Sequence, residues 1–174
     1  PAIYVTSDCE GGQVTDILAY QDGSLVNVTL NQDNGISNYT LRSYTEVSVT
    51  DINNDGVLEV PVALALPSVS ATSETTHWII YWRQFDAQGQ ATVTCITYHS
   101  TNDGWYLILP SEWDGQIAVE RDDRENHRGE RAVVFYHQEE DGTLTRFMTI
   151  YRLTGTNRDA RAKLGSRQLL LSTS

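Results

Sequence analysis

Apolar and polar residues alternate through most of the first half of the chain, and no stretch there repeats with the period of a helix. Residues 15–30 hold two such runs around Asp22-Gly23, a dipeptide favoured in the tight turns of hairpins. Two further runs, residues 77–85 and 91–100, are rich in β-branched and aromatic residues. These patterns predict antiparallel β-hairpins.

The second half of the chain mixes strand and helix signals. Residues 105–109 form a short apolar run, and Trp113 after it is expected to be buried beneath a second sheet. Residues 160–164 follow N-cap and acidic residues and precede a glycine, which is typical of a short helix. We expect an α+β, mainly β fold with antiparallel sheets and one short helix near the C-terminus. The expected domains are a β-rich region over residues 1–100 and a small α+β domain over residues 101–174.

The stretch EVSVTDINNDGVLEVPVALAL places an oxygen-rich heptapeptide between two alternating apolar runs, which predicts strand, loop and strand. Oxygen-bearing side chains recur at every second position of the loop, and a glycine then allows a sharp turn. This is the ligand spacing of a calcium loop. The expected ligands are the side-chain oxygens of Asp51, Asn53, Asp55 and Glu59 and the backbone carbonyl of Val57.

A second interpretation of the same residues stays open. The twelfth position of the loop is Val62, so the bidentate glutamate that completes an EF-hand is missing. Asn54-Asp55-Gly56 can also form a tight turn in which side chains accept hydrogen bonds from the backbone. The sequence therefore predicts either a weak calcium site, with a dissociation constant of about 10⁻⁴ M, or a plain turn.

The charge balance argues against two classes of partner. The chain has 23 acidic and 12 basic residues and a formal net charge of −11, which repels nucleic-acid phosphates and anionic membrane surfaces. No apolar run approaches the roughly 20 residues that a spanning helix needs. We expect neither a nucleic-acid partner nor a transmembrane segment in these residues. Because the chain begins at Pro1 and its only methionine is Met148, we also expect that upstream sequence has been removed.

Aromatic residues are the other candidates for a binding surface. In strands they most often pack between layers, although they can also form a platform for a sugar or a peptide. Trp78 and Trp82 lie on the same face of one expected strand, which favours packing. The residues concerned are Trp78, Trp82, Trp105, Trp113, Tyr81, Tyr98 and Tyr106.

The sequence contains no evident catalytic constellation. Glu112 and Asp114 flank Trp113, and glycoside hydrolysis uses a pair of carboxylates, but nothing assigns one as the acid and the other as the base. The 4 histidines have no metal-binding spacing, and no GxSxG motif places a serine nucleophile. We therefore expect a non-catalytic protein. A glycan-active enzyme or a carbohydrate-binding module is the alternative.

The first half of the chain carries one family resemblance. Residues 14–61 combine TDILAYQDGSLVNVTL with VTDINNDGVLEVPV, and this combination resembles the FG-GAP or VCBS type of repeat in β-propeller blades of extracellular proteins. Those repeats often carry a calcium loop, whose positions correspond here to Asp51, Asn53, Asp55 and Gly56. The resemblance covers about one blade, so other strands, or chain absent from this sequence, would have to complete a propeller of at least about four blades.

The second half carries another resemblance. GWYLILPSEWDGQIAVERDD, followed by RAVVFYHQ, RFMTIYRLTG and a short helix, is similar to the small PsbP/Mog1-like α+β domains of uncharacterised bacterial lipoproteins. This likeness implies a fold and brings no catalytic residues with it. Together the two resemblances imply a bacterial, extracytoplasmic protein, secreted or anchored as a cell-surface lipoprotein. The implied function is a binding or structural module with a cell-surface protein or a glycan as its partner.

Overall fold

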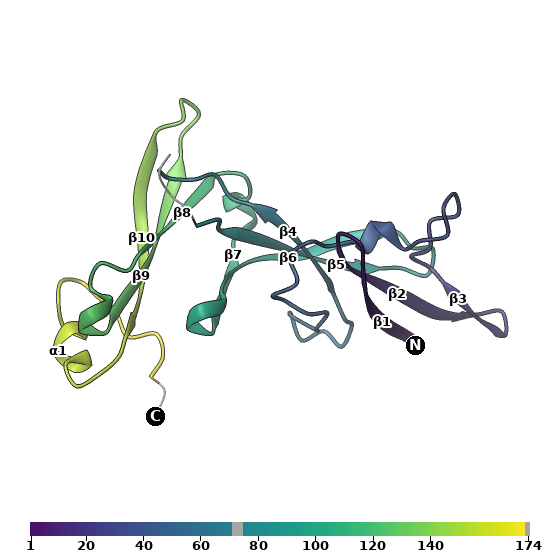
Figure 1. Cartoon of the computed structure of the whole chain (residues 1–174), viewed down its shortest axis with the longest axis horizontal. Helices are drawn as coiled ribbons and strands as arrows, with labels where there is room; N and C mark the ends of the chain where they lie inside the picture. Colours follow the sequence, from purple (N-terminus) through teal and green to yellow (C-terminus); the bar gives the residue numbers. More distant parts are fainter. Residues whose placement is uncertain (71–74, 173–174) are drawn as a thin grey trace. The chain divides into compact units, whose positions relative to one another are not determined.

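The computed structural model of the protein describes residues 1–70 and 75–172, which form ten strands in three antiparallel sheets (Figure 1). The strands are β1 (Ala2–Cys9), β2 (Gly12–Gln21), β3 (Ser24–Asn27), β4 (Val60–Ala65), β5 (Trp78–Phe85), β6 (Ala91–Ser100), β7 (Trp105–Leu109), β8 (Ile117–Asp122), β9 (Glu130–Gln138) and β10 (Leu144–Leu153). The described helices are α1 (Arg158–Ala162) and the short 3₁₀ turns η1 (Asn38–Thr40), η2 (Thr101–Asp103), η3 (Ser111–Trp113) and η4 (Asn126–Arg128). The prediction of a mainly β protein is confirmed. None of the described helices is long and apolar enough to cross a membrane.

The chain divides into two compact units. Unit 1 contains Pro1–Ala65 and Trp78–Asp114, and unit 2 contains Leu66–His77 and Gly115–Ser174. Unit 1 holds the sheets β1-β2-β3 and β4-β5-β6-β7, and unit 2 holds β10-β9-β8. This division differs from the expected one at residue 100, because β7 pairs with β6 and so belongs to unit 1. Trp113 lies in η3 of unit 1 and is only partly buried, so the prediction that it lies beneath a second sheet is wrong.

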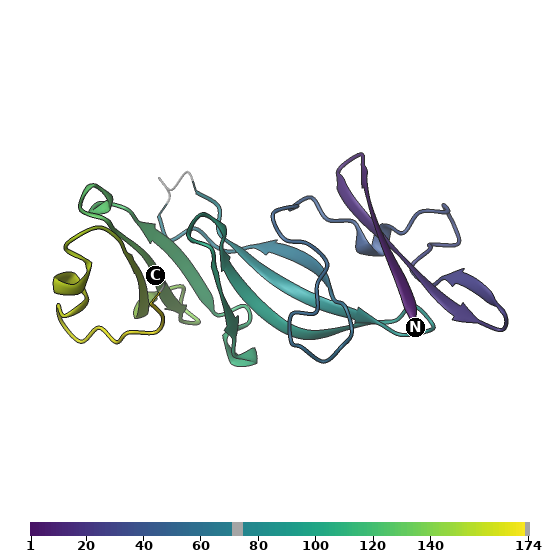
Figure 2. The ribbon, with the colours of Figure 1, turned by 90° about the horizontal axis from the view of Figure 1, so that it is seen from below.

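The predicted turn at Asp22-Gly23 joins β2 and β3. Gln21 and Ser24 face each other across it, and Asp22 and Gly23 have φ angles of 48° and 86°. Positive φ at both central residues is the geometry of a type I′ turn, whose twist matches that of paired strands. The β5–β6 turn lies beside this hairpin (Figure 2), and the Gln21 side chain donates a 2.6 Å hydrogen bond to the carbonyl of Ala87 there.

The four-stranded sheet packs against residues 44–52, which lead into and begin the candidate loop of residues 51–57. Four buried residues form this core cluster, namely Val47, Ile52, Ile80 and Trp82. The partly buried Tyr44, Ala63, Trp78 and Cys95 pack around them. Trp82 is 1% exposed, so the interpretation of Trp78 and Trp82 as packing residues on one face is confirmed.

The segments that follow and precede the candidate loop differ in secondary structure, because only the segment after the loop forms a strand. After the loop comes β4, which lies at the edge of its sheet as Pro61 predicts, because a proline cannot donate to a strand ladder. Before it, residues 41–50 form no strand, so that part of the strand, loop and strand prediction is wrong. Their backbone makes only two bridges, Gln13↔Arg42 and Thr50↔Glu59.

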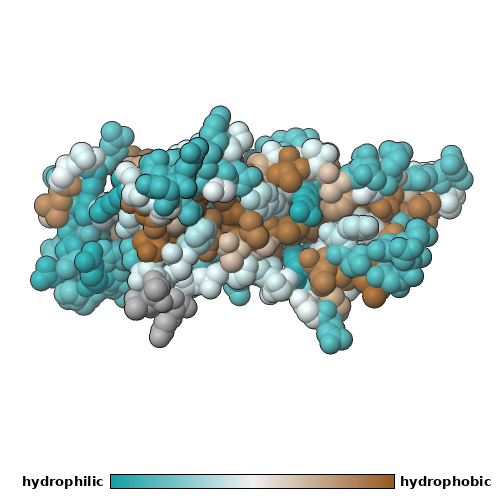
Figure 3. Space-filling view, turned by 90° about the horizontal axis from the view of Figure 1, so that it is seen from above, coloured by the Kyte–Doolittle hydropathy of each residue, from teal (hydrophilic) through white to brown (hydrophobic). Residues whose placement is uncertain are grey.

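The sheet β1-β2-β3 keeps large apolar side chains in contact with solvent. Its exposed members are Ile3, Val5, Tyr20, Leu25 and Val26. On the face seen in Figure 3, apolar residues lie in patches between hydrophilic ones. Most buried apolar residues of unit 1 instead belong to the sheet β4-β5-β6-β7.

In unit 2, one buried acid holds α1 and the following chain to β9. Glu130 accepts hydrogen bonds from Arg161 at 2.8 Å and from Arg167 at 3.0 Å. Arg167 and then Arg161 lower the pKa of this carboxyl, and the Arg167 guanidinium lies 3.7 Å from the ring centroid of Tyr151. A helix as short as α1 is not stable in isolation, so these ion pairs account for its position.

We predict that Gly12 tolerates no side chain. Its φ is +138°, and a Cβ there would lie 2.0 Å from the carbonyl oxygen of Arg42. Gly11 also has a positive φ, +90°, but a Cβ there meets nothing within 4 Å. We expect Gly11→Ala to lower the free energy of unfolding by about 1–2 kcal/mol through backbone strain. Gly12→Ala should cost about 1–3 kcal/mol more, because the backbone must shift. Urea denaturation measures both, and equal losses would contradict the close contact.

Candidate functional site

The candidate loop, residues 51–57, begins and ends at a single bridge between Thr50 and Glu59. Thr50 and Glu59 exchange two backbone hydrogen bonds, of 3.2 and 2.8 Å. The loop is therefore closed at its base immediately before β4 begins.

The side chains of the loop accept hydrogen bonds from its own backbone. The two carboxylate oxygens of Asp51 accept from the amides of Asp55 at 3.0 Å and Gly56 at 2.9 Å. The side-chain oxygen of Asn53 also accepts from the Asp55 amide, and Asp55 accepts from the amide of Val57 at 2.8 Å. This is the pattern of Asx turns. It is compatible with a bound cation, since each carboxylate oxygen has a second lone pair.

Three predicted ligands come together. Asp51, Asp55 and Glu59 each offer one carboxylate oxygen, and these oxygens lie within 4.8 Å of one another. Asn53 reaches the group through its amide, which donates to Asp55 at 3.0 Å. Val57 lies two residues after Asp55, to which its amide donates at 2.8 Å, and has an exposed fraction of 42%. The three acids could hold a metal ion.

Glu59 is the buried member of this acidic group, with an exposed fraction of 0%. One carboxylate oxygen accepts from the amide of Ile52 at 3.0 Å, and the other accepts from Gln84 at 2.9 Å and Thr94 at 3.3 Å. All three donors are uncharged. Gln84 on β5 and Thr94 on β6 were not found from the sequence, because they lie 25 and 35 residues from Glu59 and no local spacing connects them to it.

Gln84 bridges two of the acids. Its side-chain nitrogen donates to Asp55 at 2.7 Å and to Glu59 at 2.9 Å. The amide thus places the positive end of a dipole between two negative groups. The Val57 amide, then Gln84, then Asn53 lower the pKa of Asp55, because each donates a hydrogen bond to the ionised carboxylate.

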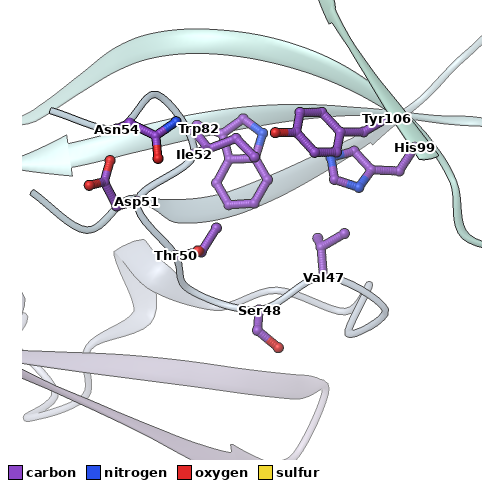
Figure 4. A pocket seen from close by; sticks show the side chains of 9 residues that line it. All are labelled: Val47, Ser48, Thr50, Asp51, Ile52, Asn54, Trp82, His99 and Tyr106. Atoms are coloured by element: carbon purple, nitrogen blue, oxygen red, sulfur yellow. The ribbon is translucent and has the colours of Figure 1, made fainter. Parts of the chain in front are cut away.

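A groove of about 350 Å³ lies beside the loop (Figure 4). Asp51 and Asn54 lie at one end of it, and His99 and Tyr106 lie at the other. Trp82 is the largest buried side chain among its lining residues. The remaining lining residues are Val47, Ser48, Thr50 and Ile52.

The aromatic end of the groove is held by hydrogen bonds and stacking. Thr97 accepts from the indole nitrogen of Trp82 at 2.7 Å and lies 2.9 Å from Nε2 of His99. The rings of His99 and Tyr106 stack with centroids 5.2 Å apart and an interplanar angle of 15°. Burial lowers the pKa of His99, so the imidazole is neutral at pH 7. Tyr106 is 49% exposed, so its ring is available to a ligand.

The other aromatic residues that the sequence offered for a binding surface do not line this groove. Tyr98 is buried, and Tyr81, Trp105 and Trp113 are partly buried. The Tyr81 hydroxyl donates to Asp114 at 2.5 Å. Burial first, and this carboxylate second, raise the pKa of Tyr81 to about 12, so the phenol stays protonated and occupies an oxygen of Asp114 over the physiological range.

Comparison of the chain with protein-family models, with curated proteins and with solved structures gives no match in any of the three.

The lowered pKa of Asp55 predicts how the stability depends on pH. Because the folded-state pKa lies below the ordinary value of about 3.9, ionised Asp55 stabilises the fold above that value. This contribution is lost as the pH falls through the folded-state pKa. Asp55→Asn should therefore flatten the acid limb of the curve of unfolding free energy against pH. Chemical denaturation across the acid range tests this, and parallel curves for the two proteins would contradict it.

Proposed function

We propose that the protein is a non-catalytic, extracytoplasmic binding or structural module whose loop of residues 51–57, together with Glu59, binds calcium. The observation that supports this most is the convergence of three carboxylates, one of them fully buried with only uncharged donors. Buried carboxylates are normally balanced by a cation, either a basic side chain or a metal.

Calcium matches this donor set by its chemistry. It is a hard cation that prefers carboxylate, amide and carbonyl oxygens in a flexible arrangement. Asp51, Asp55 and Glu59 would supply the charge, and the side-chain oxygen of Asn53 and the carbonyl of Val57 would supply neutral ligands. Without a cation the three carboxylates repel one another at these separations. Binding would relieve that repulsion in the folded state alone.

Gln84 would be a sixth ligand. Its amide already reaches two of the three acids, at 2.7 and 2.9 Å. Rotation of the amide about its last side-chain bond exchanges nitrogen for oxygen, which converts a donor to the carboxylates into a ligand for the cation. A residue from β5 would then complete a site that the loop begins.

The proposed compartment follows from the expected affinity. The loop lacks the bidentate acid of an EF-hand, because its twelfth position is Val62, and a site of this kind binds with a dissociation constant of about 10⁻⁴ M. Calcium sites of that strength belong to extracellular modules. The resemblance to FG-GAP and VCBS repeats supports the same compartment, with a cell-surface protein or a glycan as the partner.

We predict that calcium stabilises the fold. A ligand that binds the folded state alone adds about 2.7 kcal/mol to the free energy of unfolding at a concentration 100 times its dissociation constant. This should raise the thermal midpoint by several degrees. Scanning calorimetry with calcium and with EGTA measures the shift. Superimposed melting curves would contradict the calcium site.

Two matched variants separate this site from general effects of charge. Asp55→Asn removes one of the three charges and should abolish most of the shift. Asp22→Asn makes the same change in the turn between β2 and β3, where asparagine tolerates the positive φ, and should keep the shift. Equal responses from the two variants would show that calcium acts elsewhere.

The groove of Figure 4 favours a second function, glycan binding. A sugar ring has an apolar face that stacks on aromatic rings and hydroxyls that bond to polar groups, and the groove offers Tyr106 at one end and Asp51 and Asn54 at the other. Among the described residues that line it, Asp51 is the only acid. Glycoside hydrolysis needs two carboxylates, so binding fits this groove better than catalysis.

We predict that Tyr106→Ala weakens glycan binding by about tenfold or more, because the sugar loses the exposed aromatic ring on which it would stack. Tyr39→Ala is the matched control, because Tyr39 is 67% exposed and does not line the groove. Affinity electrophoresis in gels that contain different soluble polysaccharides measures retardation of each variant. If Tyr106→Ala migrates like the unaltered protein in a gel that retards it, the groove is not the binding site.

A further inference from the structure

Arg42 is a buried cation whose hydrogen-bond partners among the described residues are all uncharged. It is 3% exposed, and its terminal nitrogens donate to the Thr15 hydroxyl at 2.9 Å and to the side-chain oxygen Oε1 of Gln13 at 3.1 Å. Its Nε is buried and has no hydrogen-bond partner among the described residues. A guanidinium carries five N–H donors and keeps its charge in proteins.

In the described hydrogen-bond network, Arg42 contacts no carboxylate directly. Gln13 separates it from the nearest carboxylate in the network, since the Gln13 amide donates to Asp8 at 3.0 Å. The Thr15 hydroxyl is also paired with Thr6 at 3.0 Å. Within residues 1–70 and 75–172, no carboxylate forms an ion pair with Arg42. Buried arginines are usually paired with a carboxylate or a phosphate, because an unbalanced charge is costly to bury.

A pocket of about 350 Å³ adjoins this cation. Three of its lining residues, Tyr4, Thr6 and Ser48, carry hydroxyl groups, and two, Val49 and Leu58, are apolar. The residues that line it are Tyr4, Thr6, Gln13, Arg42, Ser48, Val49 and Leu58. The lining therefore combines one cation, several hydroxyls and a short apolar surface.

We propose that this pocket binds a small organic molecule that carries one carboxylate and a short apolar body. The carboxylate would accept hydrogen bonds from Arg42 and the nearby hydroxyls, and the apolar body would lie against Val49 and Leu58. Leu58 lies between the proposed calcium ligands Val57 and Glu59 in the chain, but none of the proposed calcium ligands lines this pocket. The carboxylate site therefore does not require a bound calcium ion.

The charge around the pocket selects a monoanion over phosphate. Arg42 is the only cation among the described lining residues. Burial raises the pKa of Tyr4, and the negative charge of Glu59 raises it further, so the field of that acid reaches the pocket. A phosphate dianion would bring a second negative charge into this field without a second guanidinium to balance it.

Nuclear magnetic resonance titration tests the proposal, with ¹⁵N-labelled protein in EGTA so that the calcium loop plays no part. Butyrate should shift the amide signals of Thr6, Gln13 and Ser48 in a saturable way. Butyramide has the same size without the charge and should not, and inorganic phosphate should bind more weakly than butyrate. No saturable shift with butyrate, equal binding of butyramide, or tighter binding of phosphate would each overturn the proposal.

Variants then locate the site. Arg42→Gln should weaken butyrate binding by about tenfold or more, through loss of a charge-assisted hydrogen bond. Leu58→Trp fills the pocket from a 37% exposed position and leaves Arg42 in place, so it tests the site even where Arg42→Gln fails to fold. Leu64→Trp, at a 58% exposed position outside the pocket, should bind like the unaltered protein. Unchanged binding by folded Leu58→Trp would also overturn the proposal.

Discussion

The fully buried carboxylate of Glu59 joins parts of unit 1 that are far apart in the sequence. The backbone of Glu59 pairs with that of Thr50 and closes the loop. The Glu59 side chain accepts hydrogen bonds from Ile52, Gln84 and Thr94. The bond to the amide of Ile52 holds that residue where its side chain enters the core of the four-stranded sheet. Because an unsatisfied buried carboxylate is costly, the loop, β5 and β6 must keep their relative positions for the fold to be stable.

Unit 1 buries two opposite charges, Glu59 and Arg42, and balances both with uncharged partners. Hydrogen-bond dipoles compensate a buried charge only in part, and an opposite charge in a medium of low dielectric constant compensates it more strongly. Each residue also lies beside groups that could share a ligand. Glu59 lies with two more acids, and Arg42 lies with the hydroxyls of a pocket. Both proposals, the cation site at Glu59 and the carboxylate site at Arg42, rest on a buried charge that lacks an opposite charge among its hydrogen-bond partners in the described residues.

Patterns of neighbouring residues in the sequence correctly predicted one hairpin turn and several strands. Asp22-Gly23 defined a turn because its two residues together accept positive φ angles, and alternation placed β5, β6 and β7 close to their observed bounds. The same alternation misled at residues 41–50. Alternation shows that one side of a segment is buried, but a strand also needs a partner along its length, and this segment finds only two bridges.

The mainly β fold, the positions of the hairpin turns and the loop that brings acidic side chains together could all be predicted from the sequence, because each depends on residues within a few positions of one another. Three features could be seen only in the folded chain: the burial of Glu59, the bridge that Gln84 makes between two acids, and the lack of a charged partner for Arg42 among the described residues. The tertiary structure also decided that β7 joins the sheet of unit 1. Burial and pairing of this kind arise between residues tens of positions apart, and the free energies that select them come from packing and desolvation that no local spacing encodes.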